Sequence, residues 1–150
     1  MKWIIVAGSS NTRKTFTLSE VVVSLVRGHG AILRSPTTLP ALQPAASPTS
    51  YPYYSDGCYE LSWRGNKIVV VTDGDIPGRV SEAFEYAVKC GADVLVSASR
   101  AGSGSGHVAQ IDGKAVSGAA DVFIVAALDH SHTASATIVA NRVNQIISMI

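Results

Sequence analysis

Short apolar runs alternate with helical patterns along most of the chain. The apolar runs are residues 3–7, 68–71, 93–98 and 122–127. Runs of this length and composition are typical of strands buried on both faces of a parallel sheet. Apolar residues recur every three or four positions within 18–26, 80–88 and 139–150, which predicts helices there, the last beginning near residue 133. This alternation predicts a three-layer α/β/α sandwich with a mainly parallel sheet.

A hairpin pattern occupies the middle of the sequence. Residues 59–63 alternate between polar and apolar, residues 64–67 have turn composition, and residues 68–71 are wholly apolar. We expect two antiparallel strands, with the first arm at the edge of the sheet and the second arm in its centre. A further short strand is predicted at residues 31–34, after the glycines that end the first helix.

Residues 35–57 differ in composition from the rest of the chain. They are rich in proline, serine and threonine, include Tyr51, Tyr53 and Tyr54, and follow no period. The pattern predicts a long loop. Two interpretations are open: a surface loop with some aromatic packing, or a lid over a ligand or a contact for a partner.

Composition narrows the class of protein. The chain has 150 residues, of which 47% are hydrophobic and 15% charged, with a formal net charge of +1. These values predict one globular domain spanning residues 1–150 and give no indication of a nucleic-acid or membrane surface. The apolar run at the N-terminus is too short for a secretion signal or a membrane span, so we expect a cytoplasmic protein.

The candidate chemistry lies at residues 8–15, with the sequence GSSNTRKT. This segment follows a predicted buried strand, begins a predicted helix, and matches the Walker A pattern, G-x-x-x-x-G-K followed by Ser or Thr, except at Arg13. In such a loop, backbone amides converge on phosphates, Lys14 reaches the β- and γ-phosphates, and Thr15 binds Mg2+. The predicted nucleotide-binding residues are Gly8, Ser9, Ser10, Asn11, Thr12, Arg13, Lys14, Thr15 and Phe16.

Arg13 occupies the position of the second glycine in the pattern. Its side chain could block the backbone path that glycine permits, or could point outward and add a phosphate contact. The sequence leaves both open. We hypothesise that nucleotide binding survives and that hydrolysis is weakened.

Candidate magnesium ligands follow the apolar strand at 68–71. Either Asp73 or Asp75 could hold the ion together with Thr15, and Asp75 could also cap the next helix. Arg100 ends another predicted strand, at the sheet edge where α/β proteins bind ligands, and is a candidate phosphate contact. Ser97 and Ser99 on that strand are weaker candidates.

Three segments, VAGSSNTRKT, IVVVTDGD and GADVLVSASRAG, resemble those of phosphate-loop NTPases, in particular small single-domain bacterial ATP-binding proteins. The resemblance implies a phosphate-loop fold that binds ATP or GTP with Mg2+. It also implies Lys14, Thr15, an acidic partner at Asp73 or Asp75, and Arg100 as site residues. It implies no particular acceptor substrate.

Several functions therefore stay open. The favoured one is binding of a nucleoside triphosphate with Mg2+, with hydrolysis or transfer of the γ-phosphoryl group by an NTPase or small kinase; Lys14, Asp73, Asp75 and Arg100 would then be catalytic. A non-catalytic nucleotide switch that docks a protein partner is the alternative. A Toprim-like nucleic-acid enzyme would instead use Asp73 and Asp75 with Mg2+. A homodimer is compatible with each.

A histidine-rich segment, residues 129–132, has two interpretations. Asp129, His130 and His132 could form a metal cluster. The segment more simply marks the start of the last helix, with Asp129 or Ser131 as its cap.

Overall fold

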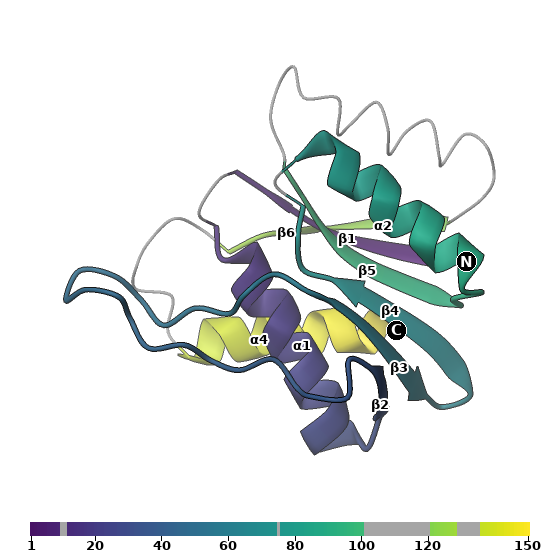
Figure 1. Cartoon of the computed structure of the whole chain (residues 1–150), viewed down its shortest axis with the longest axis horizontal. Coiled ribbons are helices and arrows are strands. Elements are labelled where there is room, and N and C mark those ends of the chain that lie inside the picture. The colour runs from purple at the N-terminus through teal and green to yellow at the C-terminus, as the bar shows by residue number, and fades with distance from the viewer. Residues whose placement is uncertain (10–11, 75, 101–120, 129–135) are drawn as a thin grey trace.

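A six-stranded mixed sheet forms the centre of the molecule (Figure 1). The computed structural model describes residues 1–9, 12–74, 76–100, 121–128 and 136–150. Within them, the strands are β1 (Lys2–Gly8), β2 (Ile32–Ser35), β3 (Cys58–Trp63), β4 (Asn66–Val71), β5 (Val94–Arg100) and β6 (Asp121–Ala126). The helices are α1 (Lys14–His29), α2 (Pro77–Lys89) and α4 (Ala136–Met149). The predicted α/β class is confirmed.

The strand order is β2-β3-β4-β5-β1-β6. β1 lies parallel to both β5 and β6, and β4 lies parallel to β5. The predicted hairpin of β3 and β4 is present and antiparallel. The prediction that its first arm is an edge strand is wrong, because β2 pairs antiparallel with the outer side of β3. The sheet is therefore parallel in one half and antiparallel in the other.

Alternate side chains of β1 enter two separate cores. Ile4 and Val6 pack with apolar residues of α1 and α4, whereas Trp3 and Ile5 pack with α2. The ring of Trp3 lies 5.0 Å from that of Phe84, measured between centroids. Because successive strand side chains point to opposite faces, one strand with a buried centre joins both layers. Helices consequently cover both faces of the sheet (Figure 1).

The helix boundaries have local causes. α1 ends at His29, where Gly30 takes a left-handed conformation (φ 71°) and its amide donates to the carbonyl of Leu25. α4 begins at Ala136 in the described part of the chain, and the predicted start near residue 133 lies outside that part. No helix among the described residues is long and apolar enough to cross a lipid bilayer.

The segment between β2 and β3, residues 36–57, extends away from the sheet and returns along α1 (Figure 1). Within this segment, Gln43 and Tyr53 form an isolated antiparallel β-bridge. Tyr54 anchors its returning arm, because the Tyr54 ring packs on Phe16 of α1 and its hydroxyl donates to Glu20. The predicted long loop is thus present, and its Tyr54 contacts the helix that follows the candidate phosphate loop.

Candidate functional site

The connection between β1 and α1 is closely packed at its first residue. A Cβ atom added at Gly8 would lie 2.4 Å from Cβ of Ala127 and 2.6 Å from Oγ1 of Thr12. The same Thr12 hydroxyl donates to the carbonyl oxygen of Ser9 at 2.8 Å. Glycine is therefore required where the chain leaves β1. Ser10 and Asn11, which the sequence also assigned to the site, lie outside the described residues.

Lys14 is buried inside this connection. The residue is only 6% exposed. Its Nζ donates to the carbonyl oxygens of Ser9 (2.8 Å) and Gly8 (3.3 Å). The first turn of α1 contains no acidic residue, and Arg13, just before it, makes no capping hydrogen bond with its side chain. Because the start of a helix carries partial positive charge, an ammonium placed there creates an electropositive site suited to an anion.

Arg13 takes a left-handed backbone conformation, with φ 54° and ψ 31°. That region favours glycine, because a Cβ atom crowds the following carbonyl. The guanidinium lies over the ring of Tyr51, 4.5 Å from its centroid, and 5.8 Å from the ring centroid of Phe16. The side chain is thus directed toward residues 36–57. Whether it also contacts a phosphate stays a prediction.

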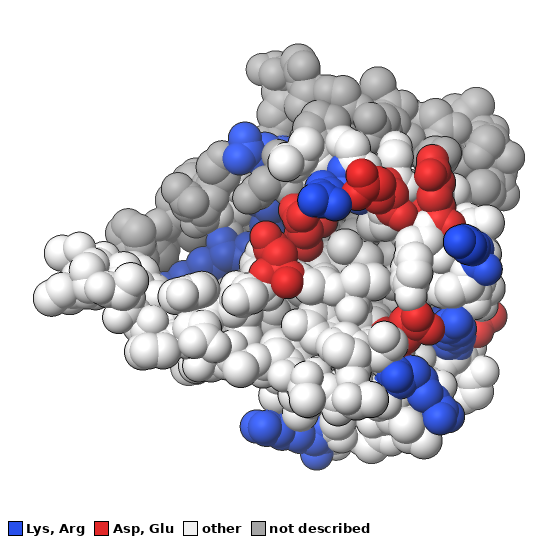
Figure 2. Space-filling view, viewed as in Figure 1, with Lys and Arg blue, Asp and Glu red and all other residues white. Residues whose placement is uncertain are grey.

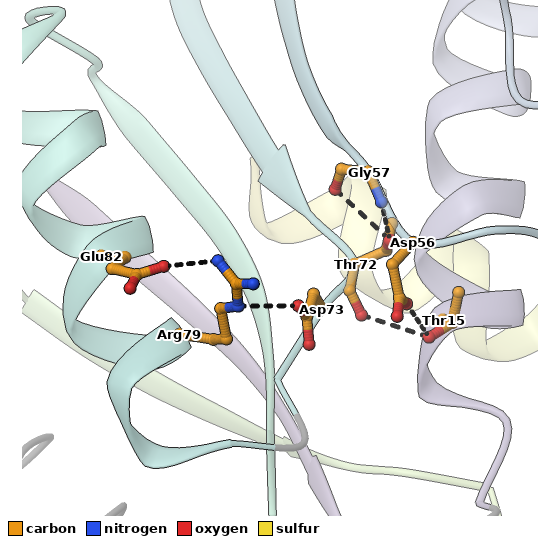
Figure 3. Close-up of polar contacts among 7 residues, drawn as sticks. All are labelled: Thr15, Asp56, Gly57, Thr72, Asp73, Arg79 and Glu82. Atoms are coloured by element: carbon orange, nitrogen blue, oxygen red, sulfur yellow. Dashed lines mark hydrogen bonds and ion pairs between the residues drawn. The ribbon is translucent and has the colours of Figure 1, made fainter.

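Thr15 meets oxygen atoms from two other segments (Figure 3). Its Oγ1 lies 2.9 Å from Oδ1 of Asp56 and 3.2 Å from the carbonyl oxygen of Thr72. One hydroxyl proton serves one of these acceptors at a time. A hydroxyl, a carboxylate and a carbonyl oxygen at this spacing are ligands of the type that Mg2+ accepts.

Asp56 is a site residue that the sequence reasoning missed. It directly precedes Gly57, whose carbonyl accepts from the amide of Thr72 at 2.9 Å and whose amide donates to Oγ1 of Thr72 at 2.8 Å. The predicted hairpin could have indicated the position of Asp56. Since its arms are antiparallel, with Cys58 opposite Val71, the residue before the first arm must lie at the end of the second.

Asp73 lies near Thr15 but has a different partner. Its Oδ2 forms an ion pair with Nε of Arg79 at 3.2 Å, and Nη1 of Arg79 also pairs with Glu82 at 2.8 Å (Figure 3). Both contacts are partly exposed, so each contributes little to stability. Asp75, the other predicted magnesium ligand, lies outside the described residues. The structure thus places Asp56, rather than Asp73, in contact with the Thr15 hydroxyl.

A cavity of about 480 Å³ opens beside this cluster. Asp56, Asp73, Arg79, Glu82 and Tyr86 are among the residues that line it. Figure 2 shows a band of acidic side chains, interrupted by a basic one, on the face in view. The cavity therefore combines carboxylates with one guanidinium, next to the Thr15 hydroxyl.

Arg100 lies at the same sheet edge as the candidate phosphate loop. The register between β1 and β5 places it opposite Gly8, and it is exposed. Ser97 does not fit the role suggested for it, because its Oγ accepts the indole N–H of Trp3 at 2.9 Å in the core beneath α2. Ser99 is fully buried, and its hydroxyl lies 3.4 Å from the carbonyl oxygen of Arg100.

Among the described residues, no group of three or more His, Cys, Asp or Glu side chains is placed so that it could hold a metal ion. Cys58 and Cys90 are free thiols. The predicted alternative at Asp129–His132 falls outside the described residues and stays a prediction.

No protein-family model, curated protein or solved structure matches the chain.

Proposed function

We propose that this protein binds a nucleoside triphosphate with Mg2+, and that the phosphates lie in the connection between β1 and α1. The observation that carries the proposal is the buried ammonium of Lys14, held at the start of α1 by two loop carbonyls. An ammonium forms stronger, charge-assisted hydrogen bonds with phosphate oxygens than with neutral carbonyls. Lys14 would therefore exchange the carbonyls of Gly8 and Ser9 for oxygens of the β- and γ-phosphates.

Thr15 and Asp56 would hold the magnesium ion on the side of the phosphates nearest β4. Their oxygen atoms lie 2.9 Å apart, so one ion could contact both after the hydroxyl proton turns away from the carboxylate. Mg2+ keeps several water ligands and needs only one or two protein ligands of this kind. Asp73 would then act through a water molecule or help to orient one.

Hydrolysis or transfer of the γ-phosphoryl group would use the same edge of the sheet. Charge neutralisation by Lys14, the ion and Arg100 is the form of catalysis that phosphoryl transfer requires. The 480 Å³ cavity beside Asp56 offers room for a small acceptor molecule. The non-catalytic switch remains the alternative, and a phosphate-release assay separates the two.

Binding is tested by calorimetry with a non-hydrolysable ATP analogue and Mg2+. We expect the native protein to bind and Lys14→Met to lose binding by at least about tenfold, because Met keeps the volume without the charge. Lys89→Ala, which removes an exposed lysine at the end of α2, is the matched control and should bind normally. Equal affinity of the native protein and Lys14→Met would refute the proposal, as would no binding by the native protein.

The Toprim-like alternative requires paired carboxylates at Asp73 and Asp75. Asp73 already forms an ion pair with Arg79, so it is a less favourable metal ligand than Asp56. The near-zero net charge also gives a duplex little electrostatic attraction.

A further inference from the structure

Residues 36–57 present two exposed tyrosines beside the candidate phosphate loop. Tyr51 and Tyr53 are 41% and 50% exposed, whereas Tyr54, their neighbour, is 9% exposed and packs on Phe16. Tyr54 thus anchors the segment on α1. The bridge between Gln43 and Tyr53 braces the same arm through its backbone, with N–O distances of 2.8 and 3.1 Å. The backbone that carries the two exposed rings is therefore held in place, although neither ring belongs to the hydrophobic core.

These rings border a cavity of about 260 Å³. Its walls include Tyr51, Tyr53 and Phe16, and also Arg13 and Thr15 from the phosphate loop and the first turn of α1. The cavity therefore adjoins the proposed phosphate site, with which it shares Arg13 and Thr15. Its volume lies just below the roughly 300 Å³ at which complete small-molecule sites begin, which suits one ring system of a larger ligand.

We propose that this cavity holds the base of the nucleotide, stacked on the rings of Tyr51 and Tyr53. The inference rests on the proposed function and deepens it. Aromatic rings and guanidinium planes are the two surfaces on which bases stack in proteins. Arg13 lines the same cavity, and its guanidinium covers one face of the Tyr51 ring at 4.5 Å from the centroid, so the base would stack on the other face of that ring. The arginine that replaces glycine in the loop thereby links the phosphate site to the base site.

The test compares two ligands and two pairs of variants. The ligands are the magnesium complexes of a non-hydrolysable ATP analogue and of inorganic tripolyphosphate, which has no base. The variants are the double substitutions Tyr51→Ala with Tyr53→Ala, and Tyr51→Phe with Tyr53→Phe. Leu42→Ala removes another exposed apolar side chain from the same segment, away from the cavity, and is the matched control.

We expect the double alanine variant to bind the ATP analogue roughly 5- to 150-fold more weakly, equivalent to about 1–3 kcal/mol for one stacked base. Its affinity for tripolyphosphate should not change. The double phenylalanine variant and Leu42→Ala should bind both ligands like the native protein, because each keeps both rings. Thermal unfolding of each variant checks that the fold is retained.

Two results would overturn the inference in different ways. If the double alanine variant binds the ATP analogue like the native protein while Lys14→Met loses both ligands, the base lies elsewhere and the phosphate site stands. If the native protein binds neither ligand, the proposed function fails and the base site fails with it.

Discussion

The hydroxyl oxygen of Thr15 lies 2.9 Å from Oδ1 of Asp56, although 41 positions separate the two residues in the sequence. The contact joins the first turn of α1 to the end of the segment that connects β2 and β3. It exists because β3 runs antiparallel to β4, which returns Asp56 to the edge of the sheet where β4 ends. Through it, the 36–57 segment contributes a carboxylate to the candidate site.

Removing the charge of Asp56 should raise the Mg2+ requirement for nucleotide binding. In Asp56→Asn, the amide oxygen can still accept from Thr15, but the anionic ligand is lost. We expect the Mg2+ concentration for half-maximal binding of the ATP analogue to rise by about tenfold or more. A magnesium titration followed by calorimetry measures it. Glu85→Gln, on the exposed side of α2, should leave it unchanged. An effect of Asp73→Asn without one of Asp56→Asn would transfer the role to Asp73.

The left-handed backbone conformation at Arg13 should make the protein less stable than glycine would at this position. Arg13→Gly and Arg13→Ala both lose the contact with Tyr51, so comparing them isolates the effect of the left-handed conformation at φ 54°. A Cβ atom costs about 1–2 kcal/mol there, and the greater freedom of unfolded glycine offsets part of it. We expect Arg13→Gly to exceed Arg13→Ala by about 1 kcal/mol in free energy of unfolding, measured with urea. Equal stabilities would contradict the assigned backbone conformation.

Gly8→Ala should destabilise the fold. The added methyl group would lie 2.4 Å from Cβ of Ala127 and force the connection after β1 to move. Overpacking of this kind costs about 1–3 kcal/mol of the free energy of unfolding. Gly28→Ala is the control, because its methyl would lie 3.7 Å from Oγ of Ser24 and Gly28 is in a helix. That variant should gain about 0.5–1 kcal/mol. A neutral Gly8→Ala would disprove the close packing.

The hairpin and α2 are joined by an interaction that depends on pH. The hydroxyl of Tyr86 and the ammonium of Lys67 both donate to the carboxylate of Glu60, and they lower the pKa of Glu60 below its ordinary value. A lowered folded pKa means that the stabilisation is present at neutral pH and is lost as pH falls through that pKa.

Glu60→Gln should therefore reduce the free energy of unfolding at neutral pH. The difference from the native protein should shrink as the pH is lowered below about 4, the ordinary pKa range of glutamate. Denaturant unfolding over a pH series measures it, with Glu85→Gln as a control for general charge effects. A difference that does not change with pH would show that the Glu60 charge contributes nothing.

Much of the fold was predictable because burial on both faces leaves a clear pattern. Almost all apolar residues of β1 and β4 are buried, as expected. Residues 122–127 were also expected to form a strand buried on both faces, and this prediction is wrong: they form β6 at the edge of the sheet, where Phe123 is 41% and Ile124 66% exposed. A strand was expected near β2, but its position beside β3 was not expected. Ile32 is exposed and the strand is short, so no pattern indicated that it would extend the sheet beyond β3.

Candidate site residues could be selected from the sequence where a single segment contains them. Lys14 and Thr15 lie in the connection and helix that follow β1, so a local motif sufficed to propose them. The position of Asp56 depends on the pairing of β3 with β4, and the composition of residues 35–57 does not indicate that Asp56 belongs to the candidate site. The left-handed conformation of Arg13 depends on the path of the loop. The sequence could not predict it, because residues other than glycine rarely adopt this conformation. Nor could sequence distinguish the buried Tyr54 from the exposed Tyr51, since both lie in the same run of polar and aromatic residues.

A crystal structure with the non-hydrolysable ATP analogue and Mg2+ tests the central claim most directly. We expect the β- and γ-phosphates to lie within the connection between β1 and α1. Nζ of Lys14 should have moved from the carbonyls of Gly8 and Ser9 onto phosphate oxygens, and the magnesium ion should lie at Thr15 and Asp56. A triphosphate bound elsewhere on the molecule, or Lys14 still bonded to its own loop at full occupancy of the ligand, would contradict it.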